Sequence, residues 1–149
     1  MSNPINKSGK DGEKRMKKFL DMYFTNGFDY NPSDGIDFIV HPAAKLEDRF
    51  YIDIKNQKGP GGRDLAVGGC VWDYQKQNGF KECYIVEGEF DFKPKVRRFA
   101  NMFAKTNFVK FKEMCIILLK SLSVDNPEKR YQDFYEKFNK PVETIERFF

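Results

Sequence analysis

Histidine and cysteine are scarce in this sequence of 149 residues, and long apolar runs are absent. No stretch approaches the ~20 apolar residues that a membrane-spanning helix requires. The single histidine, His41, argues against Ser–His or Cys–His catalysis and against a zinc site. The cysteines have neither metal-site spacing nor an even number: Cys70, Cys83 and Cys115. Any catalysis therefore has to come from carboxylates, lysines or a hard metal ion.

The first residues, MSNPINKSGKDGEKR, lack the apolar segment of a secretory signal. An odd number of cysteines without a disulfide pattern is typical of a reducing compartment, in which thiols behave as small buried side chains. We therefore expect a cytoplasmic, intracellular protein without a membrane partner. A viral or phage source stays open.

Positive charge is in modest excess. The formal net charge is +4, and lysines are dense in residues 7–18. This distribution permits a polyanionic partner such as DNA, or it serves solubility alone. The later basic residues include Lys55, Lys58, Arg63, Lys93, Lys95, Arg97 and Arg98.

Apolar spacing predicts a first helix that begins near residues 8–11 and ends before Gly27. Its core-facing stripe has i, i+3, i+4, i+7 spacing. Glu13 falls on the boundary between that stripe and a lysine-rich face, so we expect it to be neither fully solvated nor fully buried. The stripe consists of Met16, Phe19, Leu20 and Tyr23.

The remaining pattern predicts an α/β or α+β fold in which a central mixed sheet is flanked by helices, with extra C-terminal helices. We expect one domain, residues 1–149, with a core over about 8–90 and a helical extension over about 94–149. Turn chemistry marks residues 31–35. The expected strands are 36–41, 49–56 and 82–88. A loop at 58–69 precedes a segment of helical character, 70–80, which ends at Asn78-Gly79. Three helices follow: the apolar stripes of the second and third start at Phe111 and Tyr131, and that of the first consists of Val96, Phe99, Ala100 and Phe103.

Two of these strands carry charged side chains among apolar ones. Strand alternation places Tyr51, Asp53 and Lys55 on one face, opposite Phe50, Ile52 and Ile54. If the two strands are neighbours, Asp37 converges with Asp53. Two close carboxylates repel each other unless a cation joins them, and Mg²⁺ or Mn²⁺ suits oxygen ligands. The alternative without a metal site is that Asp53 and Lys55 pair with each other on a solvated strand face.

Three short motifs resemble those of the PD-(D/E)xK nucleases: Gly12-Glu13 in a helix, Gly35-Ile36-Asp37 at a strand start, and Asp53-Ile54-Lys55 in the next strand. The resemblance implies a restriction-endonuclease-like core with an α-β-β-β-α-β order. It also implies that Asp37 and Asp53 bind the metal, helped by the Ile54 carbonyl and Glu13, and that Lys55 assists the nucleophile.

The match has departures. Ile36 stands where the family has proline, the second acid is Asp rather than the commoner Glu, and Asp34 is a rival for the first acid. Asp37 is preferred because Asp34 lies in a turn. The expected DNA contacts are Lys14, Lys17, Gln57, Lys58, Arg63 and Gln75.

The sequence thus predicts a metal-dependent nuclease that hydrolyses DNA phosphodiester bonds. We expect a structure-selective or repair and recombination endonuclease, such as a junction resolvase, and a homodimer, because cutting two strands needs two active sites. The alternatives are a small restriction endonuclease and a non-catalytic nucleic-acid-binding module with the same fold.

Overall fold

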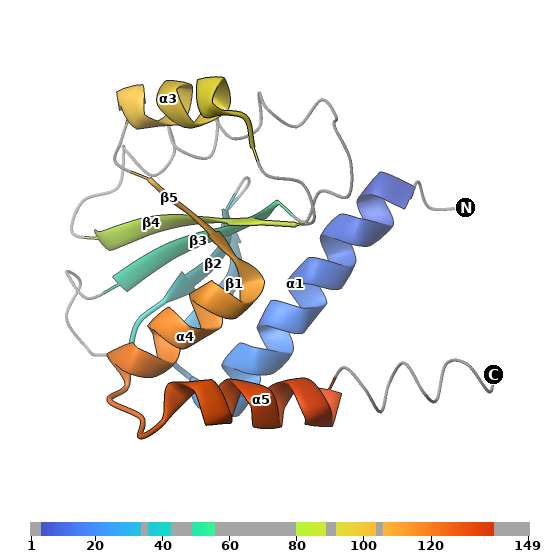
Figure 1. The fold of residues 1–149 in the computed structure, drawn as a ribbon, viewed down its shortest axis with the longest axis vertical. Helices are drawn as coiled ribbons and strands as arrows, with labels where there is room; N and C mark the ends of the chain where they lie inside the picture. Colours follow the sequence, from blue (N-terminus) through green and yellow to red (C-terminus); the bar gives the residue numbers. More distant parts are fainter. Residues whose placement is uncertain are drawn as a thin grey trace. The chain divides into compact units, whose positions relative to one another are not determined.

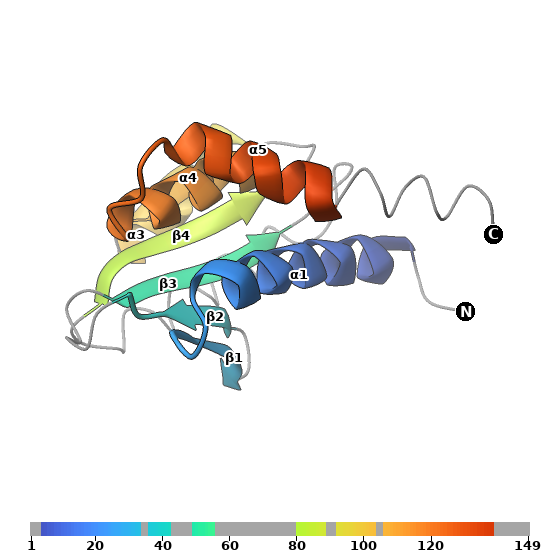
Figure 2. The same ribbon diagram turned by 90° about the horizontal axis from the view of Figure 1, so that it is seen from below.

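The computed structural model describes residues 4–33, 36–42, 49–55, 80–88, 92–103 and 106–138. The chain divides into two compact units, Met1–Phe111 and Lys112–Phe149. The first unit is a five-stranded mixed sheet with helices on its faces (Figures 1 and 2), which confirms the predicted α+β class. Its elements are α1 (Pro4–Tyr23), β1 (Phe28–Ser33), β2 (Ile36–Val40), β3 (Arg49–Lys55), β4 (Phe80–Glu87), α3 (Pro94–Phe103) and β5 (Asn107–Lys110).

The sheet keeps the strand order of the chain, β1-β2-β3-β4-β5. The β1–β2 and β2–β3 pairs are antiparallel, whereas β3–β4 and β4–β5 are parallel. Parallel neighbours need a crossover connection, and α3 provides the one from β4 to β5. The central strand β3 is buried at every residue between its two ends. Its sequence RFYIDIK therefore places a charged residue, Asp53, inside the core.

Helix α1 starts at Pro4, earlier than the predicted residues 8–11. Proline suits the first turn of a helix, because its missing amide proton would have no helical partner there. The predicted apolar stripe is confirmed at Met16, Phe19 and Leu20, which are fully buried, while its fourth member, Tyr23, is half-buried. Helices α1 and α3 lie on opposite faces of the sheet (Figures 1 and 2).

Strand β1 was not predicted, because its sequence FDYNPS was interpreted as the start of a turn. Proline is tolerated in an edge strand, where one side of the backbone has no ladder partner. The rings of Phe28 and Tyr30 lie 6.3 and 5.1 Å from that of Phe38 across the β1–β2 pair. This aromatic packing stabilises the strand despite Pro32.

Helix α3 was predicted correctly, but one member of its expected core stripe was not. Val96 and Ala100 are buried in a cluster with Ile85, whereas Phe99 is 41% exposed. Strand β5 was missed altogether: its four residues, NFVK, are too few for a periodic signal.

The second unit contains the helices α4 (Phe111–Ser121) and α5 (Pro127–Phe138), both of which were predicted. Ser123 and Asn126 adopt positive φ in the turn between them, and the Asn126 side chain accepts a hydrogen bond from the backbone amide of Lys129. None of the described helices combines the length and the apolar character that crossing a membrane requires. The predicted loop 58–69 and residues 70–79 of the predicted helical segment lie outside the described residues, and Phe80 begins β4.

Candidate active site

The pairing of β2 with β3 brings the two predicted acids together. Phe38 is the register partner of Ile52, so the antiparallel ladder sets the adjacent residues Asp37 and Asp53 side by side. Oδ2 of Asp37 accepts a hydrogen bond of 2.6 Å from the backbone amide of Ile54. The side chain of one strand is thus anchored to the backbone of the next, within one residue of Asp53.

Asp53 is buried, with 1% of its surface exposed, which excludes the solvated strand face considered above. The reason is that β3 has a hydrogen-bonded neighbour on each side and covered faces above and below. Oδ2 of Asp53 forms an ion pair with the Lys55 ammonium. Lys55 is itself only 11% exposed at its side chain. The pair therefore lies in a region of low dielectric constant, where charge interactions are strong.

Glu13 reaches the same region from α1. It is partly buried, as its position on the helix predicts, and its Oε2 accepts a hydrogen bond of 2.9 Å from the Tyr30 hydroxyl of β1. Its carboxyl group interacts with that of Asp37 and with the Lys55 ammonium. Two strands and a helix therefore contribute three acids and one lysine to a single cluster: Glu13, Asp37, Asp53 and Lys55.

The electrostatics of this acid–lysine cluster are unfavourable to three negative charges. Burial, followed by the neighbouring Asp53 carboxylate, raises the pKa of Asp37 to about 7, against the opposing bond from Ile54. Burial also raises the pKa of Asp53, although the Lys55 ammonium opposes the shift. The pKa of Glu13 rises through burial and the charge of Asp37. One ammonium group does not offset three carboxylates in partly or fully buried positions, and the pKa of each acid is therefore raised.

The donor set suits a hard divalent cation, which prefers carboxylate, carbonyl and water oxygens. Among the residues that the structure describes, no group of three or more His, Cys, Asp or Glu side chains is arranged as a metal cluster. The carboxylates point to protein donors instead: Asp37 to the Ile54 amide, Asp53 to Lys55, and Glu13 to Tyr30. A bound cation would compete for these oxygens and relieve the repulsion that raises their pKa values.

The predicted DNA contacts are only partly within the described residues. Lys14 and Lys17 are exposed on α1, and Lys17 forms an ion pair of 3.1 Å with Asp21. Four others, together with the rival acid Asp34, lie outside the described part of the chain: Gln57, Lys58, Arg63 and Gln75.

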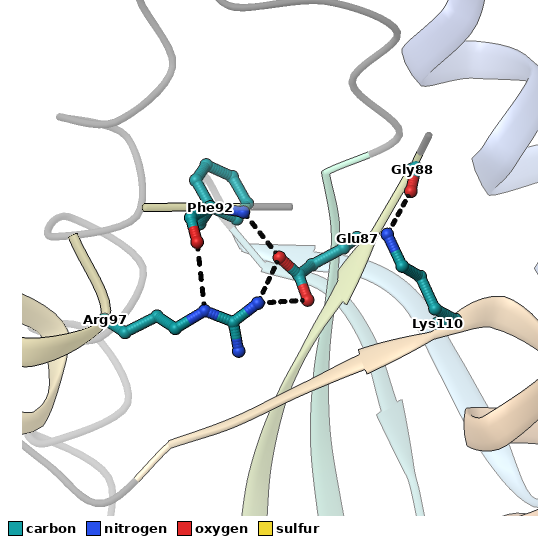
Figure 3. A network of polar contacts seen from close by, with 5 residues as sticks. All are labelled: Glu87, Gly88, Phe92, Arg97 and Lys110. Carbon is teal, nitrogen blue, oxygen red and sulfur yellow. Dashed lines mark hydrogen bonds and ion pairs between the residues drawn. The ribbon is translucent and has the colours of Figure 1, made fainter. Parts of the chain in front are cut away.

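Two features near the cluster were missed from the sequence. Tyr30 was missed because β1 was not recognised as a strand. The other is a network at the end of β4 (Figure 3), in which Glu87 accepts a hydrogen bond of 2.6 Å from the amide of Phe92. Both carboxylate oxygens of Glu87 lie 2.8 Å from Nη2 of Arg97, whose Nε donates to the Phe92 carbonyl at 3.0 Å. The only sequence signal was an acid at the end of an apolar strand.

Comparison of the chain with protein-family models, characterised proteins and solved structures found no match.

Proposed function

We propose that the protein is a divalent-metal-dependent nuclease that hydrolyses phosphodiester bonds in DNA. One observation carries the proposal: Glu13, Asp37 and Lys55, all partly buried, converge from α1, β2 and β3 around the buried Asp53, and the three acids have raised pKa values. Acids with perturbed pKa values cluster at functional sites, and this supports a catalytic role for the group.

Each member of the cluster has a role that follows from its environment. Asp37 and Asp53 would hold Mg²⁺ or Mn²⁺, with the Ile54 carbonyl and Glu13 as further oxygen donors. When bound, such an ion lowers the pKa of a coordinated water and stabilises negative charge on a phosphate. The bond from the Ile54 amide fixes the orientation of the Asp37 carboxylate.

Lys55 remains cationic beside Asp53 and is positioned to orient the attacking water or to neutralise charge that develops on the phosphate. Its ion pair holds it at the cluster before substrate binds. Preorganisation of this kind lowers the cost of aligning a charged group at the moment of reaction.

The order of elements supports a restriction-endonuclease-like core as part of this proposal. A helix carrying Glu13 precedes three antiparallel strands, and the fourth strand lies parallel to the third. The acids lie at the start of β2 and near the end of β3, and the lysine ends β3. A structure-selective or repair and recombination endonuclease, acting as a homodimer on both strands of DNA, fits the small size of the chain.

Cleavage of plasmid, linear, single-stranded and four-way-junction DNA with Mg²⁺ tests the proposal. We expect Asp53→Asn and Lys55→Met to reduce cleavage at least 100-fold, because each removes a group from the reacting centre. Asp133→Asn and Lys129→Met are matched controls: they make the same chemical changes at exposed sites on α5 and should leave cleavage unchanged.

A second readout does not depend on activity. Saturating Mg²⁺ should raise the melting temperature of the wild type and the two controls, since an ion that binds only the folded state adds about 2.7 kcal/mol at a hundred times its Kd. Asp53→Asn should lose this rise. If no DNA is cleaved and Mg²⁺ leaves the wild-type melting temperature unchanged, the protein is not a metal-dependent nuclease.

A further inference from the structure

Helix α3 has one buried face and one exposed face. Val96 and Ala100 pack with Ile85 and Phe92 beneath the helix. The exposed face follows helical spacing i, i+3, i+4, i+7 and includes two apolar side chains, Phe99 at 41% and Met102 at 79% exposure. We call this face the α3 stripe; it consists of Lys95, Arg98, Phe99 and Met102.

The α3 stripe combines positive charge with apolar surface. The ten residues of α3 include Lys95, Arg97 and Arg98 and no Asp or Glu. Cations one turn apart match the phosphates of a nucleic-acid backbone, and an exposed aromatic ring offers a face on which a base can stack. A duplex hides its base faces inside the helical stack, so this combination fits unpaired nucleotides better than double-stranded DNA.

The start of α3 is tied to the strand that lies beside the acid–lysine cluster. Glu87 at the end of β4 is the register partner of Lys55 at the end of β3. The carboxylate of Glu87 is held by Arg97 of α3 and by the amide of Phe92, which precedes the helix (Figure 3). The guanidinium group of Arg97 also lies 4.8 Å from the centre of the Phe108 ring. These contacts fix the first turn of α3 near the ends of β3 and β4, where Lys55 and Glu87 are neighbours.

We propose that the α3 stripe binds an unpaired segment of a nucleic acid, with Lys95 and Arg98 on its phosphates and Phe99 stacked on a base. The proposal rests on the proposed function in one respect, that the bound strand is the substrate of the nuclease. A nuclease with this surface selects DNA that has single-stranded or branched regions. Binding itself needs no catalysis by the acid–lysine cluster.

Fluorescence anisotropy with a fluorescein-labelled 20-nucleotide oligo-dT, in EDTA and at several salt concentrations, tests the surface. Lys95→Ala/Arg98→Ala should weaken binding at least 10-fold and reduce the salt slope by about 1.4, because two phosphate contacts on a single strand are lost. Lys120→Ala/Lys129→Ala removes the same charge from exposed positions on α4 and α5 and should leave affinity within 2-fold of the wild type.

A conservative pair at Phe99 separates stacking from apolar contact. Phe99→Leu should weaken binding to oligo-dT by about 5-fold to 100-fold, the usual loss of one base–aromatic stack, whereas Phe99→Tyr should retain it. A labelled duplex of the same length should bind more weakly and respond to neither change. Circular dichroism melts verify that each variant is folded.

The possible outcomes separate this proposal from the proposed function. Loss of binding in the stripe variants supports the surface. If the wild type also cleaves no DNA and Mg²⁺ does not raise its melting temperature, the surface stands and the nuclease is overturned. Cleavage of branched DNA that the stripe variants leave unchanged supports the nuclease and overturns the role of the α3 stripe in selecting its substrate. If the wild type does not bind oligo-dT, or if the stripe variants match the Lys120/Lys129 control, the α3 stripe does not bind nucleic acid.

Discussion

Asp53 and Glu87 are buried carboxylates on the neighbouring parallel strands β3 and β4, and their surroundings differ sharply. Glu87 receives the Phe92 amide and the Arg97 guanidinium, all at 2.6–2.8 Å. Its negative charge is therefore matched by donors from the segment that follows the strand. Glu87 closes the connection between β4 and α3, and its burial is explained by structure alone.

Asp53 has a cation, Lys55, but it also lies beside the carboxyl groups of Asp37 and Glu13. Burial raises its pKa, and so the charged form is disfavoured in the folded protein. A buried acid that is crowded by other acids costs stability, and natural proteins keep such arrangements mainly where function requires them. The contrast separates a structural carboxylate from a candidate catalytic one on the same sheet.

A large effect is expected from a substitution that breaks the structural side of this comparison. Glu87→Ala removes the acceptor of the Phe92 amide and leaves Arg97 without its ion pair. We expect a loss of about 3 kcal/mol in the free energy of unfolding, measured by urea titration, because the buried Phe92 amide loses its acceptor and the partly buried Arg97 loses its ion pair. Glu87→Gln retains an acceptor of similar size and should lose less than half as much. A loss below about 1 kcal/mol in Glu87→Ala would contradict this expectation. It would show that water takes the place of the carboxylate and satisfies the groups that Glu87 leaves.

The next prediction concerns Asp37, a member of the acid–lysine cluster around Asp53. The pKa of Asp37 is about 7 in the folded protein and near 3.8 when unfolded. Between pH 4 and 7 the folded state keeps a proton that the unfolded state has released, so the free energy of unfolding falls as pH rises, by up to about 1.4 kcal/mol per pH unit. Above pH 7 Asp37 is ionised in both states, and the full destabilisation by its buried charge is present.

Asp37→Asn cannot titrate, so its stability relative to the wild type should increase from pH 4 to 7 and then level off. Urea titrations of both proteins in EDTA at pH 4, 5, 6, 7 and 8 measure this difference. Carboxylates outside the acid–lysine cluster cancel in the comparison, whereas Asp53 and Glu13 lose a charged neighbour in the variant, and the measured difference includes that change. A difference that does not change with pH would mean that Asp37 titrates normally in the folded protein.

Local patterns predicted the helices and the strands that carry the acids, because periodicity and caps act within a few residues. The convergence of Asp37 with Asp53 could be predicted from strand alternation on the assumption that β2 and β3 are neighbours. The burial of Asp53 did not follow, since alternation identifies a face and not what covers it. That information lies in β4, a partner about thirty residues further along the chain.

The missed elements have related causes. Strand β1 contains Pro32, and it is stabilised by aromatic contacts with the next strand that no local pattern shows. Strand β5 has only four residues and depends on its parallel pairing with β4. The role of Glu87 depends on Arg97, ten residues away and on another element. In each case a contact between elements overrides local propensity.

The smallest expected effect extends the comparison to exposed charge. Lys17 pairs with Asp21 one helical turn away on α1, with both side chains about half exposed. Lys17→Ala should change the free energy of unfolding by less than about 0.5 kcal/mol, because solvent and salt screen such a pair. If Lys17 contacts duplex DNA, the same change should lower the salt slope of binding by about 0.9. An unchanged slope in anisotropy titrations would mean that Lys17 does not contact DNA and only pairs with Asp21. The partly buried Glu13 and the exposed Lys17 of α1 would then differ in function as well as in energy.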